Sequence, residues 1–387
     1  MKKLAIITTH PIQYNAPLFA LLSKRKRIQV RVFYTWGEGV LEKKFDPGFG
    51  INIEWDIPLL NGYDYTFLKN VSSKPGSSHF TGIDNPTIHS EIEDWGADAV
   101  LVFGWAFKSH LSVMRHFKNK IPVIFRGDST LLDQHSFIMH WARTILLRWV
   151  YRYIDVALYV GEANKNYFIA NKVPSKKLVH APHAIDNERF FVKDEYLLKA
   201  AGMKESLGIK DGELVYLFAA KFERKKYPVK LIEAFIQVKH PNAHLVMIGD
   251  GTLENDMRLA AGNHPRIHFL PFQNQSVMPV IYHLGDVFVL PSLGPETWGL
   301  AVNEAMAAGK AVLVSNTCGC AFNLVKHGYN GYIFKSGDIT DLVHHMQLVA
   351  DQSDQLKIMG TRSLEIVQAY NFTSICEVIE NVVNDAR

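Results

Sequence analysis

The chain has 387 residues, of which 48% are hydrophobic and 21% charged, and its mean hydropathy is −0.03. This length predicts two domains of comparable size, and the composition excludes intrinsic disorder, low complexity and repeat arrays. The formal net charge is only +4, and no apolar run approaches the ~18 residues that a membrane span needs.

Short apolar runs alternate with longer amphipathic runs along the chain, which predicts parallel sheets covered by helices. In the front half, strands are expected at 3–9, 30–36, 98–105, 121–127, 155–161 and 177–185, and helices at 17–26, 108–120, 138–153 and 163–172. After the polar stretch 186–211 the pattern restarts, with strands at 213–222, 244–251, 266–272, 286–292 and 311–316, and helices at 227–240, 253–262, 277–285 and 300–309. The sequence therefore predicts two Rossmann-like domains, each of the α/β class.

Basic residues are concentrated in the front half. Residues 1–185 hold 23 Lys and Arg against 15 Asp and Glu, whereas the remainder holds 19 against 23. Basic clusters lie at 24–27 and along "WARTILLRWVYR" at 141–152. Each cluster alone is typical of a solvated face, but together they indicate contact with an anionic partner such as a phospholipid surface or a lipid phosphate.

Two carboxylates, Glu296 and Glu304, lie in the segment "PSLGPETWGLAVNEAMAAGK". The first belongs to a loop and the second to a helix predicted to begin near Leu300, so the backbone amides up to Gly299 form a helix N-terminus that favours an anion. By spacing alone, a capping acid and a surface glutamate would explain the pair, as would a general acid and base. Beside an anion site, carboxylates suit accepting hydrogen bonds from hydroxyls.

Two lysines follow the first strand of the back half in "AAKFERKKYP". Lys221 leaves the strand and Lys226 precedes the next helix, so both could neutralise a diphosphate without a metal. A solvated basic loop explains the same residues equally well.

In their order and spacing, "KFERKKYPVKLIEAF", "LVMIGDGTLE", "DVFVLPS" and "ETWGLAVNEAMAAGKAVLVSN" resemble the retaining nucleotide-sugar glycosyltransferases of the GT-B fold known as family 4. The resemblance covers nearly the whole back half and is looser in front. It implies an α/β, GT-B fold of two Rossmann-like domains with parallel sheets facing a central cleft. The expected domains are an acceptor domain at 1–190, a donor domain at 191–370 and a C-terminal helix at 371–387 that crosses back to the first.

The resemblance also implies roles for matched residues. Glu304 would bind the ribose hydroxyls, Glu296 would contact the transferred sugar, and Lys221 and Lys226 would hold the diphosphate. Lys221 replaces the family's usual Arg, which keeps the charge but loses the bidentate fork. The other donor-binding candidates are the amides of Thr297, Trp298 and Gly299, the helix start at Leu300, the glycine turn of Gly249 and Gly251, and Phe272 in the segment where the family packs the base.

The front half departs from the family pattern at two places. His10 stands at the turn where the family often carries a Gly-Gly loop, and "RGDS" replaces a histidine that often touches the donor hexose. Arg126 or Asp128 could take over that contact, with Asp128 orienting the acceptor hydroxyl, or the two could simply pair with each other. No Asp-x-Asp occurs in the chain and no metal is expected, because Cys318 and Cys320 make a poor metal motif and favour a tight loop.

Together these features and the resemblance predict an enzyme that moves a hexose-class sugar from UDP- or GDP-sugar to a glycan or polyprenyl-linked acceptor in bacterial cell-surface polysaccharide synthesis. The resemblance implies that the anomeric configuration is retained. The three cysteines indicate reduced thiols and a cytoplasmic location. Peripheral binding to the inner face of the plasma membrane is left open, and no nucleic acid partner is expected. The alternative is a nucleotide-sugar epimerase of GT-B shape. A dinucleotide oxidoreductase is disfavoured because "GDGTLE" lacks the third glycine of its motif.

Overall fold

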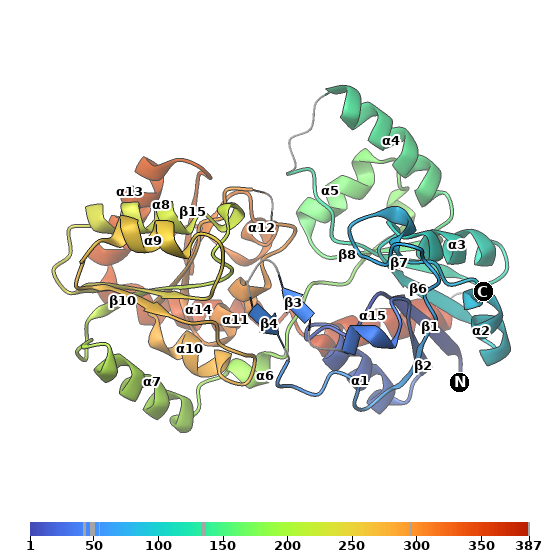
Figure 1. Cartoon of the computed structure of the whole chain (residues 1–387), viewed down its shortest axis with the longest axis horizontal. Coiled ribbons are helices and arrows are strands. Elements are labelled where there is room, and N and C mark those ends of the chain that lie inside the picture. Colours follow the sequence, from blue (N-terminus) through green and yellow to red (C-terminus); the bar gives the residue numbers. More distant parts are fainter. Residues whose placement is uncertain (42–43, 47–50, 54, 133–136, 295, 386–387) are drawn as a thin grey trace. The chain divides into compact units, whose positions relative to one another are not determined.

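The computed structural model describes residues 1–41, 44–46, 51–53, 55–132, 137–294 and 296–385. The chain divides into two compact units. The first, which we call the front unit, consists of residues 1–44, 58–183 and 372–387, and the second, the back unit, consists of residues 45–57 and 184–371. Figure 1 colours the chain along its sequence, so that each unit can be followed separately.

The front unit is built on a seven-stranded parallel sheet in the order β5-β2-β1-β6-β7-β8-β9. The central strands β1, β6 and β7 are mostly apolar and buried at nearly every position, which is typical of parallel sheets that helices cover on both faces. Its elements are β1 (Lys3–Thr8), α1 (Ala16–Arg25), β2 (Gln29–Tyr34), η1 (Glu38–Leu41), β5 (Asp64–Phe67), η2 (Phe80–Gly82), α2 (Ile88–Trp95), β6 (Ala99–Phe103), α3 (Lys108–Phe117), β7 (Val123–Arg126), α4 (Phe137–Tyr151), β8 (Val156–Tyr159), α5 (Glu162–Ala170), η3 (Ser175–Lys177), β9 (Leu178–His180) and α15 (Phe372–Asp385).

The last helix, α15, is fastened to α1 within the front unit. The Arg25 guanidinium donates from Nε and Nη2 to the two oxygens of Glu380, at 2.7 and 3.0 Å, and the Glu380 side chain is only 1% exposed. Lys2 Nζ donates to the backbone carbonyl of Val383 at 3.1 Å, where a helix C-terminus leaves carbonyls without helical partners. Helix α15 is therefore an integral part of this unit.

The back unit is built on a six-stranded parallel sheet in the order β12-β11-β10-β13-β14-β15. The helices α8, α9 and α13 pack on one face (Figure 1), and their apolar side chains join those of the strands in one core. The elements of this sheet and its covering helices are α6 (Asn187–Phe190), α7 (Asp194–Ser206), β10 (Leu214–Ala219), η4 (Arg224–Lys226), α8 (Pro228–Gln237), β11 (Ala243–Ile248), α9 (Glu254–Ala261), β12 (Ile267–Leu270), α10 (Met278–Leu284), β13 (Val287–Leu290), α11 (Leu300–Ala307), β14 (Ala311–Ser315), α12 (Ala321–Leu324), β15 (Gly331–Phe334), α13 (Ile339–Asp351), η5 (Ser353–Gln355) and α14 (Leu356–Val367).

The structure contains elements beyond those expected from the sequence. In the front unit these include β5 and α2, and in the back unit they include α12, β15, α13 and α14. The stretch 186–211 is more than a polar connection, because it contains the helices α6 and α7. A separate two-stranded sheet pairs β3 (Lys44–Asp46) with β4 (Ile51–Ile53), and the segment 45–57 is part of the back unit. Near the end of this segment, Asp56 Oδ1 accepts a hydrogen bond from the Ser276 amide of the back unit at 3.1 Å.

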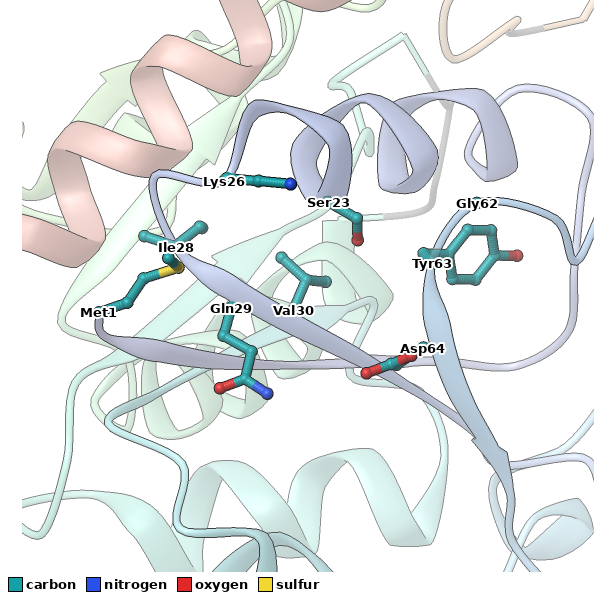
Figure 2. Close-up of a pocket in the computed structure, with 9 residues that line it drawn as sticks. All are labelled: Met1, Ser23, Lys26, Ile28, Gln29, Val30, Gly62, Tyr63 and Asp64. Carbon is teal, nitrogen blue, oxygen red and sulfur yellow. The ribbon is translucent and has the colours of Figure 1, made fainter.

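A surface hollow of about 440 Å³ lies at the amino ends of β1, β2 and β5 (Figure 2). Its walls include Met1, Lys26, Gln29 and Asp64. Open parallel sheets bind their ligands beyond the carboxyl ends of the strands. This hollow therefore lies at the opposite edge of its sheet, and none of the predicted catalytic or donor-binding residues lines it.

Candidate functional site

The candidate donor site lies at the carboxyl edge of the six-stranded sheet. The chain runs from β10 outward through β11 to β12 and then returns to place β13 on the other side of β10. Successive crossovers therefore diverge between β10 and β13, which is the switch point where open α/β sheets bind ligands. The loops that leave these two strands carry both predicted lysines, Glu296 and the predicted amides of Thr297, Trp298 and Gly299.

Glu296 is the central residue of the loop after β13. Its backbone is held on both sides, because its amide donates to the Thr317 carbonyl at 3.0 Å and its carbonyl accepts from the Gly319 amide at 2.9 Å. Its side chain is 16% exposed and forms an ion pair with Lys226. The hydroxyl of Ser292 donates to the same carboxylate oxygen at 3.3 Å. The backbone is thus fixed while the carboxylate points to a cation.

Lys226 ends the short helix η4 in the loop after β10. The next residue, Tyr227, has a φ of 58°, a left-handed conformation that is unusual for a bulky side chain and that lets α8 begin at Pro228. The Leu293 amide donates to the Lys225 carbonyl at 2.8 Å, which ties this loop to the loop after β13. Lys221 is half-buried directly beyond the end of β10. Both predicted lysines therefore stand at the switch point.

The glycine turn after β11 allows a close approach of two backbones. Gly249 has a φ of 144°, and a Cβ atom built on it would lie 2.1 Å from the Ala220 carbonyl oxygen. Gly251 has a φ of 155°, and its Cβ would lie 2.6 Å from the Phe222 carbonyl oxygen. Only glycine fits both positions, so this turn packs directly under the lysine loop. Beyond β12, the Phe272 amide donates to Asp250 Oδ2 at 3.1 Å, which places the third predicted segment next to the turn.

The helix α11 begins where the loop after β13 ends. Gly299 is its N-cap and Leu300 its first residue, as the sequence predicts. The Trp298 side chain is 3% exposed and its Nε1 donates to Asn303 Oδ1 at 2.8 Å. Because the indole is buried, Trp298 has only its backbone to offer a ligand, and it anchors the loop that presents the amides of Thr297 and Gly299.

Glu304 lies just over one turn into α11 and is 3% exposed. The hydroxyl of Tyr282, on α10, donates to Glu304 Oε2 at 2.7 Å, and Tyr282 itself is fully buried. A surface helix glutamate is therefore excluded. Burying a carboxylate is costly unless polar partners accompany it, so this position has a specific purpose in the fold or in ligand binding.

The remaining predicted residues belong to the front unit and are described there alone. The Arg126 guanidinium is 5% exposed and donates to the carbonyls of Ala181 and Pro182 at 2.8 and 3.0 Å, and burial lowers its pKa to about 10. Asp128 Oδ2 lies 3.8 Å from His183 Nε2. Arg126 thus ties β7 to the segment after β9, and the structure places His183 beside Asp128.

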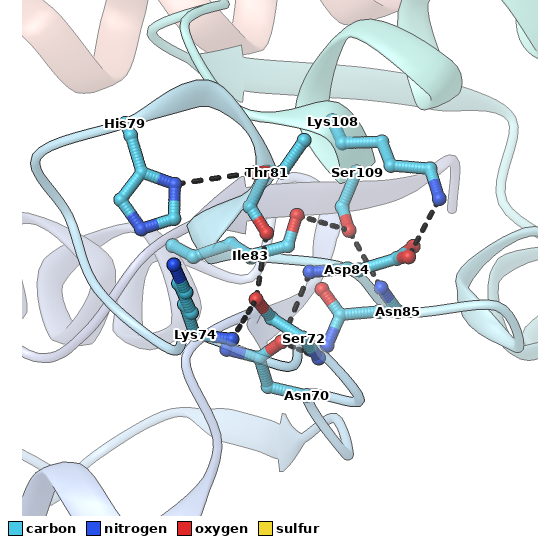
Figure 3. Close-up of polar contacts among 10 residues, drawn as sticks. All are labelled: Asn70, Ser72, Lys74, His79, Thr81, Ile83, Asp84, Asn85, Lys108 and Ser109. Atoms are coloured by element: carbon cyan, nitrogen blue, oxygen red, sulfur yellow. Dashed lines mark hydrogen bonds and ion pairs between the residues drawn. The ribbon is translucent and has the colours of Figure 1, made fainter.

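His10 follows β1 at the carboxyl edge of the seven-stranded sheet. Its Nδ1 lies 2.8 Å from the Thr9 hydroxyl, and its ring meets Trp36 edge-on with centroids 5.4 Å apart. The loop after β5 begins at the same edge of this sheet and is cross-linked by polar contacts (Figure 3). Asn70 Oδ1 accepts from the Asp84 amide at 3.0 Å, and Lys108 Nζ donates to Asp84 Oδ2 at 2.6 Å. Polar contacts therefore gather at this edge of the sheet.

The Cys-Gly-Cys segment is a buried turn. Cys318 and Cys320 are both free thiols, and burial raises the pKa of Cys318 to about 11 and that of Cys320 well above its usual value. Within the described part of the chain, no group of three or more His, Cys, Asp or Glu side chains is placed to hold a metal ion.

Three residues that lie beside the predicted site residues were not predicted from the sequence, namely Tyr282, Ser292 and His183. Tyr282 lies 22 residues before its partner Glu304, and no motif links them. Ser292 could have been noticed as the last residue of the "DVFVLPS" strand. His183 lies in "VHAPHAID", where a histidine flanked by proline and alanine gives only a weak signal.

Comparison with known proteins adds independent findings. Residues 201–365 match the family described as "Glycosyl transferases group 1". A glycosyltransferase of Methanocaldococcus jannaschii is 27% identical over 184 residues, which cover 46% of this chain and 47% of that protein. The alpha-monoglucosyldiacylglycerol synthase of Acholeplasma laidlawii is 29% identical over 272 residues, 64% of each chain. The chain spans less than two thirds of the length of these curated relatives.

Among solved structures, Anabaena HepE in complex with UDP and glucose superposes with a TM-score of 0.72 at 17% identity, and each chain is covered completely. At this identity the likeness shows the fold alone. It confirms the GT-B fold that the sequence predicts, with its two parallel sheets of seven and six strands.

Proposed function

We propose that this chain transfers a hexose-class sugar from a UDP- or GDP-sugar to a glycan or lipid-linked acceptor. Through residues 201–365 the chain belongs to the glycosyl transferases group 1 family. This family consists of retaining enzymes that use nucleotide sugars. The reaction class proposed is hexosyl transfer with retention. Its proposed setting is the synthesis of bacterial cell-surface polysaccharide.

One observation carries the proposal. At the switch point of the six-stranded sheet, the structure brings together Lys226, Glu296 and the N-terminus of α11, although these residues are up to 74 positions apart. A lysine and helix-terminal amides stabilise a diphosphate, while Glu296 and Glu304 supply acceptors for hydroxyls. A nucleoside diphosphate sugar carries both kinds of group.

The proposed chemistry needs no covalent intermediate. Lys221, Lys226 and the amides near Gly299 would stabilise the negative charge that develops as the bond between the anomeric carbon and the diphosphate breaks. The acceptor hydroxyl attacks the same face of the sugar, and its proton passes to the departing phosphate oxygen. Glu296 and Glu304 bind sugar and ribose hydroxyls, and the front unit is proposed to bind the acceptor.

The lipid-linked acceptor is supported by the surface of α4 in the front unit. Ile145 and Leu146 are 48% and 46% exposed, and the exposed Arg148 and Arg152 follow on the same segment. An exposed apolar pair beside arginines suits the interface of an anionic membrane. The relative from Acholeplasma laidlawii is named for a glucosylated diacylglycerol. Within the described residues, no helix is both long and apolar enough to span a bilayer.

A thermal-shift screen against UDP, GDP, ADP and their sugars tests the donor. Stabilisation by one nucleoside diphosphate and its sugar is expected, since ligand binding to the folded state raises the melting temperature. The absence of any shift would contradict the proposal. Turnover of the donor without an acceptor, to an epimerised sugar, would instead match an epimerase.

Sedimentation with anionic vesicles tests the acceptor surface. The double variant Arg148→Glu/Arg152→Glu should lose vesicle binding, at about 1 kcal/mol for each basic residue near the surface. The matched control is Lys199→Glu/Lys357→Glu, which reverses two exposed charges of the back unit. Wild-type protein that ignores anionic vesicles and glycosylates a soluble acceptor would contradict the lipid-linked acceptor.

A further inference from the structure

The ion pair between Lys226 and Glu296 has a consequence for ligand binding. Both side chains are 16% exposed, and Ser292 adds a hydrogen bond to the carboxylate. In the proposed function, however, the two groups face different parts of the ligand, since Lys226 binds phosphate and Glu296 binds sugar hydroxyls. The structure therefore pairs the two proposed ligand-binding groups with each other.

Main-chain hydrogen bonds hold the backbone close to both residues of the pair. The Leu293 amide bonds to the Lys225 carbonyl at 2.8 Å, and Glu296 is held by Thr317 and Gly319 through main-chain hydrogen bonds. A change at this point is therefore confined to the two side chains. Each has several rotatable bonds, whereas their backbones are tied to neighbouring loops.

We propose that the diphosphate of the donor competes with Glu296 for Lys226, so that phosphate binding releases the Glu296 carboxylate to bind the sugar. The inference rests on the proposed function. A phosphate oxygen offers Lys226 the same charge-assisted hydrogen bond that the carboxylate offers. Once phosphate is bound, like charge repels Glu296 from it, and the sugar hydroxyls become the favourable partners for the carboxylate.

This exchange makes sugar recognition conditional on the diphosphate. A hexose without a diphosphate meets a carboxylate that is already paired, whereas a complete donor meets a carboxylate that its own phosphate has released. By linkage, each part of the ligand then strengthens the binding of the other. Glu296 is in this sense a specificity-determining residue whose availability Lys226 controls.

Calorimetric titration with inorganic pyrophosphate tests the exchange in four proteins: the wild type, Glu296→Gln, Lys226→Met and the double variant. Glu296→Gln should bind pyrophosphate about tenfold tighter than the wild type, equivalent to about 1.4 kcal/mol, because no ion pair has to be broken. Lys226→Met should bind it weakly. In the Lys226→Met background, Glu296→Gln should change the affinity less than twofold.

A matched control separates the exchange from a general change of charge. Glu254→Gln removes one carboxylate of the same unit that pairs with Arg258 and not with Lys226, and it should leave pyrophosphate affinity unchanged. A second readout compares a nucleoside diphosphate with its nucleotide sugar. The extra affinity that the sugar provides should be lost in Glu296→Gln, although the nucleoside diphosphate itself binds more tightly.

The outcomes distinguish this inference from the proposed function. If the wild type binds pyrophosphate and Glu296→Gln binds it no tighter, the exchange is wrong and the donor site stands. If Glu296→Gln tightens binding equally with and without Lys226, the effect is long-range electrostatics and the exchange is again wrong. If neither the wild type nor Glu296→Gln binds pyrophosphate, UDP or GDP, both the exchange and the proposed function are overturned.

Discussion

Replacing Tyr282 with phenylalanine tests whether the buried hydroxyl positions Glu304 for the donor. The change removes one oxygen from a fully buried ring and breaks the 2.7 Å hydrogen bond to Glu304 Oε2. A hydrogen bond to a charged group contributes about 1.5–3 kcal/mol to stability. For a unit of this size that loss corresponds to a fall in melting temperature of about 3–12 °C.

The functional effect should be separable from the stability effect. A carboxylate that loses one of its partners samples more orientations, so the proposed binding of the donor ribose weakens equally in the ground state and in the transition state. We expect the KM for the donor to rise about tenfold while kcat changes less than threefold, which is the pattern of lost uniform binding. Initial rates at varied donor concentration, well below the melting temperature, measure both constants.

Tyr216→Phe is the matched control. Tyr216 is also fully buried in the back unit and donates to the Met346 carbonyl at 2.6 Å, but its partner is a neutral backbone group of α13. It should lower stability by about 0.5–1.5 kcal/mol and leave the donor KM unchanged. An unchanged KM in Tyr282→Phe, or an equal rise in both variants, would refute the positioning of Glu304 by Tyr282.

Three further predictions concern the two units. Gly249→Ala should abolish donor binding and destabilise the back unit by about 2 kcal/mol or more, since the added Cβ would lie 2.1 Å from the Ala220 carbonyl oxygen. Thermal melting measures the loss of stability and titration with UDP or GDP measures the loss of binding. Normal binding of the nucleotide would contradict this prediction. Glu380→Gln should lower the free energy of unfolding of the front unit by about 3 kcal/mol, because it leaves the Arg25 guanidinium without its buried carboxylate partner. Urea denaturation measures this loss, and a value below about 1 kcal/mol would argue against a stabilising role of the Arg25–Glu380 ion pair. Burial lowers the pKa of His110 from 6.5 to about 4, so the unfolded chain binds a proton at this side chain more readily than the folded chain does. The contribution of neutral His110 to stability should therefore be complete above about pH 6.5 and decline toward pH 4. Melting temperatures measured across this range should decline less steeply in His110→Gln than in the wild type.

The sequence alone determined the fold class and the local elements of the back unit between β10 and β14. Apolar runs such as residues 214–219 and 243–248 form strands that are buried at every position, and the alternation of strands with amphipathic helices permits only covered parallel sheets. The start of α11 at Leu300 also followed from local signals, because a glycine precedes a run of helix formers. These features depend on residues that are close in sequence.

The candidate site was determined by the sequence only in its parts. Spacing within one loop placed Glu296 and Glu304 on either side of a helix start, and it placed Lys221 and Lys226 in the loop after the first strand of the back unit. It left open whether the lysines were a solvated loop and whether Glu304 was on the surface. Those alternatives depend on which loops become neighbours, and neighbouring loops come from strands that are distant in the chain.

Only the tertiary structure decided which side chains meet. The strand order brings β10 next to β13, and this alone pairs Lys226 with Glu296 across 70 residues of sequence. Packing of α10 against α11 likewise buries Glu304 beside Tyr282, and the end of β9 gives Arg126 two backbone carbonyls. Periodicity reports which face of an element is buried, but the partner of a buried polar group is chosen by the packing of elements that the chain brings together from afar.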